Sequence, residues 1–155
     1  MLFLLFQLGA ERFALEADRV VEVVPLLELK RLPQAPKGVA GLVNYRGQPV
    51  PAIDLSELTL GQPAAERLST RIVIVHHADA LGRDHLLGLI AENATDLLQK
   101  DPSELNHSAG SYRSAPYLGP VFVDAKGPVQ CLREQYLLPA PVQDLLFNEP
   151  ATASS

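Results

Sequence analysis

Four histidines are the residues of this 155-residue chain with the most capacity for metal or acid–base chemistry: His76, His77, His85 and His107. A zinc site requires ligands at close spacings such as H-x-x-x-H, together with cysteine or carboxylate partners. His76 and His77 are adjacent in a run that predicts a strand, so their side chains point to opposite faces and cannot chelate one ion. We predict no metal site and no cofactor.

Covalent and acid–base catalysis have no clear set of residues either. The single cysteine, Cys131, lies in the alternating run Val-Gln-Cys-Leu at 129–132, which predicts a buried and inert thiol. The sequence contains no G-x-S-x-G elbow, no glycine-rich phosphate loop and no C-x-x-C pair. Asp101, Glu104 and Asp124 are better explained as solvated loop residues than as paired acids. We therefore predict no catalytic residue and no enzymatic activity.

The most informative polar residues lie in the stretch 44–55, Asn-Tyr-Arg-Gly-Gln-Pro-Val-Pro-Ala-Ile-Asp-Leu. A strand at 41–45, a turn around Gly47 and a second strand after it predict a hairpin, because glycine tolerates the positive φ of a tight turn. Pro49 and Pro51 have no backbone N–H, so one edge of the second strand cannot be fully hydrogen-bonded. A plain structural hairpin is the competing interpretation of this stretch.

Short apolar runs separated by turn residues predict strands along the whole chain. They cover 2–8, 13–16, 20–24, 41–45, 50–55, 71–76, 86–91, 121–124, 129–132 and 135–138. A short helix is predicted near 55–60, with Asp54 as its cap and Gly61 as its stop. A second helix, at 141–147, opens on a proline. This is the pattern of an all-β barrel or sandwich.

The segments between these elements differ in length and character. Residues 62–70 are polar and rich in alanine, and they predict a loop. Residues 100–120 form a longer stretch with two prolines and four serines before Pro120, and a loop of that length is often functional. The small polar residues at 148–155 predict a disordered tail.

The charge balance and the first residues restrict the class of partner. The formal net charge of -5 argues against a nucleic-acid-binding protein, which needs a basic face. The apolar run at 1–6 is far shorter than the roughly 18 residues that a membrane span needs. It also lacks the basic segment and the cleavage site of a signal peptide. We predict a cytoplasmic protein that does not insert into a membrane.

Several short motifs follow one another in a defined order. They are Phe-Gln-Leu-Gly at 6–9, Phe-Ala-Leu at 13–15, Val-Val-Glu-Val at 20–23, Leu-Pro-Gln-Ala-Pro at 32–36, Val-Ala-Gly-Leu-Val-Asn-Tyr-Arg-Gly at 39–47, Val-Pro-Ala-Ile-Asp-Leu at 50–55, Arg-Ile-Val-Ile-Val at 71–75 and Gly-Leu-Ile-Ala-Glu-Asn at 88–93. In this order and spacing, the chain resembles the CheW-like adaptor domain of bacterial chemosensory systems over nearly its whole length. The hairpin motif is the most specific piece, and the second half is less so.

The resemblance implies two SH3-like five-stranded β-barrels that share one hydrophobic core, in a single domain at 1–147. One lobe is centred on about 18–76 and the other on 1–16 plus 86–140. The resemblance also implies a non-enzymatic scaffold that couples chemoreceptors, the methyl-accepting chemotaxis proteins, to a CheA-type histidine kinase. The expected partners are the cytoplasmic tip of the chemoreceptor and the regulatory domain of the kinase.

The family's receptor-facing positions correspond to four residues of this sequence: Val20, Glu22, Asn44 and Arg46. For Glu22, the alternative is a residue that points to solvent from a strand whose valines point inward. For Arg46, a guanidinium near a turn offers five donors to a partner, and the alternative is an internal ion pair with Glu22 or Asp54. The two roles of Arg46 do not exclude each other.

Three further residues are expected to shape the hairpin itself: Gly47, Pro51 and Asp54. The chain departs from the family pattern at Pro49, where a β-branched residue is usual, and at 137–139, where Leu-Leu-Pro replaces two aliphatic residues and an aspartate. These departures suggest a scaffold of a specialised, non-flagellar pathway.

Two rival functions stay open from the sequence. One is a regulatory CheW-like domain that binds the receptor without the kinase. The other is a small-molecule-binding or hydrolytic β-barrel, in which the loop at 100–120 and His107 form a lid.

Overall fold

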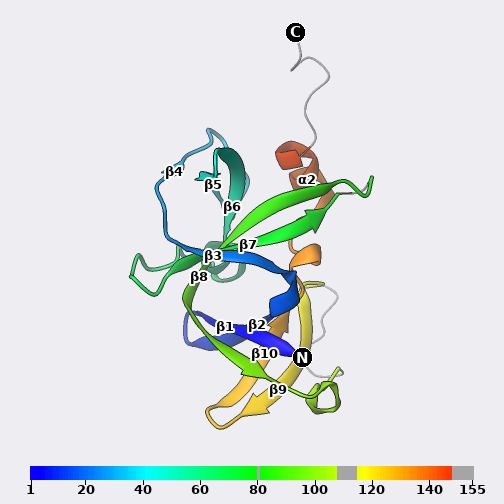
Figure 1. Ribbon diagram of the computed structural model, residues 1–155. Helices are drawn as coiled ribbons and strands as arrows, with labels where there is room; N and C mark the ends of the chain where they lie inside the picture. The colour runs from blue at the N-terminus through cyan, green and yellow to red at the C-terminus, as the bar shows by residue number, and fades with distance from the viewer. Residues whose placement is uncertain (80, 108–114, 148–155) are drawn as a thin grey trace.

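Ten strands, two short α-helices and three 3-10 helices make up the part of the chain that the computed structural model describes, residues 1–79, 81–107 and 115–147 (Figure 1). The strands are β1 (Leu2–Leu8), β2 (Glu11–Glu16), β3 (Val20–Pro25), β4 (Leu29–Lys30), β5 (Val39–Tyr45), β6 (Gln48–Asp54), β7 (Arg71–Ala78), β8 (Asp84–Gln99), β9 (Leu118–Asp124) and β10 (Gly127–Leu132). The helices are α1 (Leu55–Leu60), α2 (Ala140–Phe147), η1 (Ala17–Arg19), η2 (Pro102–Glu104) and η3 (Glu134–Tyr136).

The long strand β8 connects the two halves of the molecule. Its first half pairs antiparallel with β7 and, over three residues, parallel with β6. Its second half pairs antiparallel with β1, from Glu92 opposite Gln7 to Gln99 opposite Leu2. Asn93 has a φ of 51°, and the register against β1 shifts nearby, so the strand changes direction where it passes from one set of neighbours to the other. Figure 1 shows β8 running from the upper group of strands to the lower one.

Two groups of strands result from this arrangement. The upper group contains β3, β7, the first half of β8, β6, β5 and the two-residue β4. The lower group contains the second half of β8, then β1, β2, β10 and β9 in that order. The lobe boundary expected near residue 86 therefore falls inside a strand, and the pairing groups residues 84–91 with β6 and β7.

Buried apolar side chains form three clusters that follow the same division. One lies inside the upper strands and includes Val43, Val50, Ile72 and Ile74. A smaller one lies inside the lower strands around Phe3 and Phe122, whose ring centroids are 5.3 Å apart. The largest cluster takes residues from both groups: Leu4, Phe6, Leu8, Leu15, Val39, Ile53, Leu55, Val73, Val75, Leu87, Leu89, Ala91, Ala94, Leu132, Leu137 and Leu138. We call it the shared core.

Most of the strand predictions agree with the structure, but the strand predicted at 135–138 is wrong. Residues Glu134–Tyr136 form the 3-10 helix η3, closed by the bond from the Leu137 N–H to the Glu134 carbonyl (3.1 Å). The physical reason is the pattern of burial. Glu134 is buried by its ion pair with Arg19, and Leu137 and Leu138 both enter the shared core, which the alternating faces of a strand would not allow.

The ends of several predicted segments also need adjustment. The long loop at 100–120 contains η2, an isolated bridge between Asn106 and Val121, and the start of β9. Its residues 108–114 and the tail at 148–155 lie outside the described residues. No described helix has both the length and the apolar character needed to cross a bilayer.

Candidate partner-binding site

The predicted hairpin is present as β5–β6, but its turn has two residues, Arg46-Gly47, and not the three expected at 46–48, because Gln48 already pairs with Tyr45. Both residues have positive φ, 52° for Arg46 and 83° for Gly47, which is the turn geometry that matches the twist of paired strands. The side-chain oxygen of Asn44 accepts a hydrogen bond from the Gly47 N–H (2.8 Å). Asn44 therefore helps to close the turn, and the turn presents the Arg46 side chain at the end of the hairpin.

Strand β3 brings Glu22 to the hairpin. The hydroxyl of Tyr45 donates to Glu22 Oε1 at 2.7 Å, and Arg46 Nη2 donates to the same oxygen at 2.7 Å. The Arg46 guanidinium also lies 5.3 Å from the centroid of the Tyr45 ring, within cation–π range. The hydrogen bond to Glu22 raises the pKa of Tyr45. We call Glu22, Tyr45 and Arg46 the hairpin cluster.

The two charged residues of the hairpin cluster face solvent, whereas Tyr45 is 8% exposed. The Arg46 side chain is 74% exposed and that of Glu22 is 37% exposed. An ion pair with this exposure contributes about 0–1 kcal/mol to folding, so the guanidinium is available to a partner at little cost. Val21, beside Glu22 on β3, is 40% exposed. Strand β3 and the hairpin thus expose both charged groups and an apolar side chain.

The four predicted receptor-facing residues therefore divide into two kinds. Glu22 and Arg46 are in contact, and Asn44 lies in the same hairpin but is engaged with Gly47. Val20 pairs with Val75 and packs, partly buried, against the shared core, and the register of β3 shifts between Val20 and Glu22. Of the two partners considered for Arg46, Glu22 is the one it contacts.

Asp54 has a different set of partners. It is 6% exposed and caps α1 by accepting the Glu57 N–H at 3.1 Å, and its carboxylate also accepts the Ala64 N–H at 3.0 Å. Helix α1 ends at Gly61, which has the left-handed φ expected of a stop. Asp54 thus holds both the start of α1 and the loop that follows it.

The two prolines of β6 limit its pairing in the way that the sequence predicts. Opposite β5, Pro49 lies against Asn44 and Pro51 against Leu42, and that pairing runs from Gln48 to Ile53. On its other side, β6 pairs with β8 only at Ala52–Asp54, beyond the prolines. The absence of two backbone donors explains why the first half of β6 is not part of that ladder.

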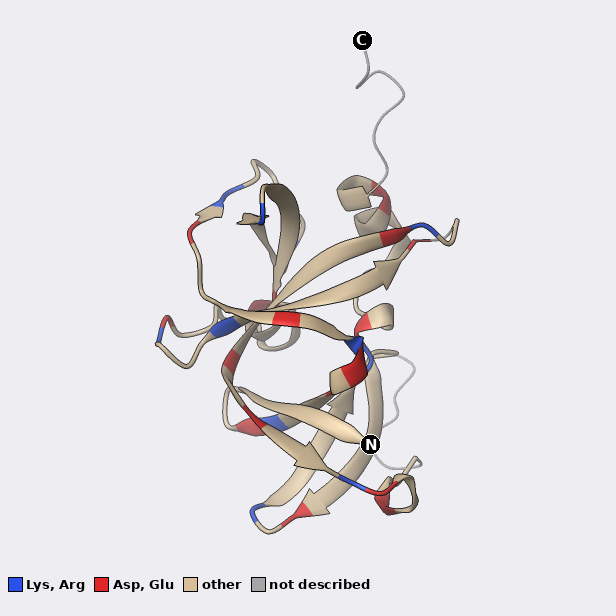
Figure 2. Ribbon diagram, viewed as in Figure 1, with Lys and Arg blue, Asp and Glu red and all other residues tan. Residues whose placement is uncertain are grey.

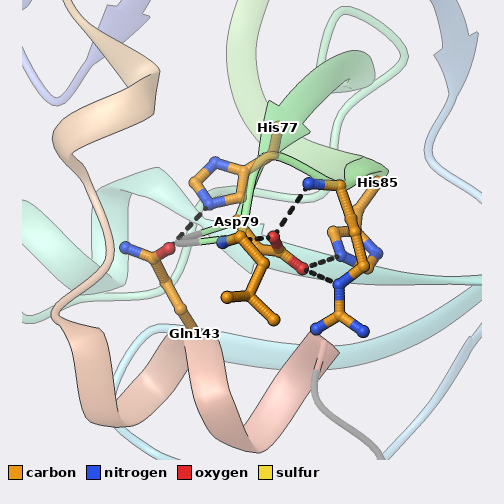
Figure 3. Close-up of polar contacts among 6 residues, drawn as sticks. His77, Asp79, His85 and Gln143 are labelled. Carbon is orange, nitrogen blue, oxygen red and sulfur yellow. Dashed lines mark hydrogen bonds and ion pairs between the residues drawn. The ribbon is translucent and has the colours of Figure 1, made fainter.

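Two groups of residues were missed from the sequence. The sequence pattern assigns Tyr45 only to a strand, although a mostly buried tyrosine generally needs a partner for its hydroxyl. The second group joins the ends of β7 and β8 to α2 through His77, Asp79, His85 and Gln143 (Figure 3). The prediction that His76 and His77 face opposite ways is confirmed, since His76 is exposed and His77 is buried.

The rival interpretation as a ligand-binding barrel finds no support in the residues near His107. A cavity of about 250 Å³ lies there, and Glu16, Cys131, Arg133 and Glu134 are among its lining residues. The Glu134 carboxylate is already paired with Arg19. Burial raises the pKa of the Cys131 thiol to about 12, which leaves it protonated at neutral pH.

Charge is mixed over the molecule. Figure 2 shows Lys and Arg interspersed with Asp and Glu on both groups of strands. Within residues 1–79, 81–107 and 115–147, no three His, Cys, Asp or Glu side chains are grouped so as to hold a metal ion.

The fold and this site define an all-β protein of two small barrels that share a strand and a core, with an ion-paired cluster exposed on one hairpin.

The particular family follows from comparison with known proteins. The chain matches the CheW-like domain family over residues 2–140, and it belongs to that family. The chemotaxis protein CheW of Rhizobium meliloti (strain 1021) is 30% identical over 93 residues, which cover 60% of this chain and 57% of that protein. The chemotaxis protein CheW of Helicobacter pylori is 31% identical over 99 residues, covering 61% and 59%. The chain thus spans less than two thirds of the length of these curated relatives.

A solved structure supports the fold. The crystal structure of the scaffolding protein TtCheW from Thermoanaerobacter tengcongensis aligns with a TM-score of 0.77 at 21% identity. The alignment covers 91% of this chain and 89% of that one. The resemblance inferred from the motifs and the fold of two SH3-like barrels are both confirmed.

Proposed function

We propose that this protein is a non-enzymatic scaffold that couples chemoreceptors to a CheA-type histidine kinase in a chemosensory pathway. The relatives that it matches are named as chemotaxis proteins, and the solved relative is described as a scaffolding protein. The observation that carries the proposal for this chain is the exposed hairpin cluster. A solvated guanidinium and an exposed valine, Val21, one residue before its ion-pair partner Glu22, offer a partner both charge and apolar area.

In this proposal, Glu22 and Arg46 contact the cytoplasmic tip of the receptor, and Val20 and Asn44 support them. Gly47, Pro51 and Asp54 keep the hairpin and α1 in shape. Residues 1–147 act as one domain of two lobes, at the cytoplasmic face of a receptor array. The kinase contributes its regulatory domain to the complex.

Reconstitution tests the proposal. The purified chain is mixed with receptor cytoplasmic fragments and a CheA-type kinase from its own source, and co-sedimentation and receptor-dependent kinase autophosphorylation are measured. Recovery of receptor and kinase together, with kinase activity that depends on this chain, supports the scaffold. Recovery of the receptor alone supports the regulatory rival, and recovery of neither overturns the proposal.

Arg46→Glu is the sharpest variant. We expect at least a tenfold loss of receptor binding, because the reversed charge repels Glu22 and removes the donors offered to the receptor. The free energy of unfolding should change by only about 1 kcal/mol, since the pair is exposed. Arg67→Glu is the matched control, because Arg67 is also exposed and undergoes the same charge change in the loop before β7.

The double variant Glu22→Arg/Arg46→Glu separates the two roles of Arg46. If Arg46 only holds the hairpin through Glu22, the swapped pair restores receptor binding. If Arg46 contacts the receptor, binding stays low although the ion pair is restored. We expect the second outcome, because three quarters of the Arg46 side chain is open to solvent.

A further inference from the structure

Helix α2 has little to hold it together as an isolated segment. It has eight residues, no acidic residue in its first turn, no basic residue in its last turn and no fully buried residue. Helices shorter than about 12–15 residues are marginal in water on their own. Helix α2 therefore depends on its contacts with the rest of the protein, chiefly those of Val142, Leu146 and Phe147 with the shared core.

A buried histidine forms the polar part of this contact. His77, on β7, is 1% exposed, and its Nε2 lies 3.1 Å from Oε1 of Gln143 on α2 (Figure 3). The Gln143 amide nitrogen donates to the Leu138 carbonyl at 2.8 Å, which directs the amide oxygen toward the histidine. Since that oxygen can only accept, the His77 ring carries a proton on Nε2.

The other ring nitrogen of His77 has no partner. Across the described residues, His77 Nδ1 is the buried side-chain nitrogen or oxygen that lacks any hydrogen bond. In the neutral ring, Nδ1 is a bare acceptor. In the protonated ring it becomes an N–H that points into the protein without an acceptor, and a buried unpaired donor destabilises the state that contains it.

Phe147, the last residue of α2, fits between two histidines. Its ring centroid is 5.2 Å from that of His77 and 4.6 Å from that of His85, and both pairs are stacked. The position of the His85 ring is fixed by Asp79, whose Oδ2 lies 2.8 Å from His85 Nε2. The same carboxylate oxygen accepts a hydrogen bond from Arg83 Nε at 2.8 Å. The hydrogen bond with His85 lowers the pKa of Asp79, so this carboxylate stays charged in mild acid.

We propose that protonation of His77 releases α2 from the ends of β7 and β8, so that the helix leaves the shared core when the pH falls. The neutral ring suits the docked helix, because its one N–H meets Gln143. The protonated ring suits the undocked state, in which water satisfies both N–H groups.

The charged and titratable groups of the surrounding elements do not supply the missing acceptor. From the β7–β8 side these are Asp79, His85 and Arg83, and the Asp79 oxygens bond to the other two. Helix α2 contributes Asp144, next to Gln143, and η3 contributes Glu134, which is paired with Arg19. His85 also stacks on Phe147, but its hydrogen-bond partner, Asp79, is not part of α2. His77 is therefore the histidine whose hydrogen-bond partner belongs to the helix.

Hydrogen exchange tests the proposal in the 155-residue chain. Protection factors of the α2 amides, corrected for the pH dependence of intrinsic exchange, are compared at pH 8 and pH 5.5. We expect protection to fall at least tenfold in α2 at the lower pH, while β1 and β10 keep theirs. Equal protection at the two pH values, or an equal loss in all elements, overturns the proposal.

Variants assign the effect to one histidine. His77→Gln should abolish the pH dependence of α2 protection, whereas His76→Gln, the exposed neighbour, and His85→Gln should retain it. Retention of the pH dependence in His77→Gln contradicts the proposal. If that variant does not fold, the His77 ring is titrated by NMR in the wild type. Its titration midpoint must then coincide with the loss of α2 protection, and titration without that loss contradicts the proposal.

Discussion

Arg46 illustrates how one side chain can serve both the fold and a partner. Its backbone has the positive φ that the turn needs, and its guanidinium donates a hydrogen bond to Glu22 and lies over the Tyr45 ring. Most of the side chain is still open to solvent. Its weak internal ion pair keeps the guanidinium in place without committing all five of its donors. The structural and partner-binding interpretations of this residue are therefore compatible.

The pair Arg12–Asp124, between β2 and β9, is the opposite case, because it is a structural ion pair. Two hydrogen bonds join the side chains, from Arg12 Nη1 to Oδ1 at 2.6 Å and from Nη2 to Oδ2 at 2.5 Å. Both side chains are mostly shielded from solvent. The hydrogen bond from Arg12 lowers the pKa of Asp124 below its ordinary value of 3.8. The folded state then binds a proton less readily than the unfolded chain. The pair's stabilisation is complete above pH 3.8 and is lost as the pH falls toward the folded-state pKa.

We predict that Arg12→Ala lowers the free energy of unfolding by about 1–2 kcal/mol at pH 7, and by clearly less at pH 3. Urea unfolding at the two pH values measures both differences. Lys126→Ala is the control, since Lys126 meets Asp124 through its backbone N–H and keeps that bond in the variant. An equal effect of Arg12→Ala at both pH values contradicts the assignment.

The elements that local chemistry specifies are those with a turn or a cap in the sequence. The β5–β6 hairpin and α1 are examples, and both form where their turn residues and Asp54 predict them. The strand predicted at 135–138 lacks such a signal, and there the burial of Glu134 and of two leucines decides the conformation. Local signals are reliable where the backbone itself needs a particular residue.

Gly41, within β5, is a position where the backbone itself requires glycine. Its φ is 147°, and a Cβ added there lies 2.3 Å from the carbonyl oxygen of Lys30 on β4. We predict that Gly41→Ala costs about 2 kcal/mol or more and separates β4 from β5. Thermal unfolding and amide exchange in β4 measure the two effects.

Gly47→Ala provides the matched comparison. Gly47 also has a positive φ, 83°, but nothing lies within 4 Å of an added Cβ. Its cost should be limited to about 1–2 kcal/mol of backbone strain. A larger loss for Gly47→Ala than for Gly41→Ala contradicts the importance of the close contact with β4.

At the scale of the whole molecule, the shared core couples the two groups of strands. It takes Leu15 from β2 and Leu132 from β10 below, and Val73 from β7 and Leu89 from β8 above. Because β8 also continues through both groups, neither can lose its packing without exposing the apolar face of the other. We expect the described chain to unfold as one cooperative unit.

The variant Leu89→Ala tests this expectation. Leu89 is 1% exposed, so its truncation should lower the free energy of unfolding by about 3 kcal/mol. Amide exchange in β5 and in β10 should report the same loss of stability. Only β5 belongs to the upper group, with which the first half of β8 pairs, so an equal loss in β10 shows that the two groups are coupled. Leu68→Ala, at a fully exposed leucine, should change neither. A loss in β5 without one in β10 indicates independent lobes.

The sequence alone determined the features that depend on short stretches of chain. The strand pattern, the hairpin turn, the cap of α1, the inert cysteine and the motif order of the family all follow from neighbouring residues, because turns, caps and side-chain alternation are local. The tertiary structure decided which distant residues meet: Glu22 with Arg46, the two halves of β8 with different neighbours, and His77 with Gln143, 66 positions along the chain. These contacts depend on how the two groups of strands pack around the shared core, and no local pattern encodes that packing.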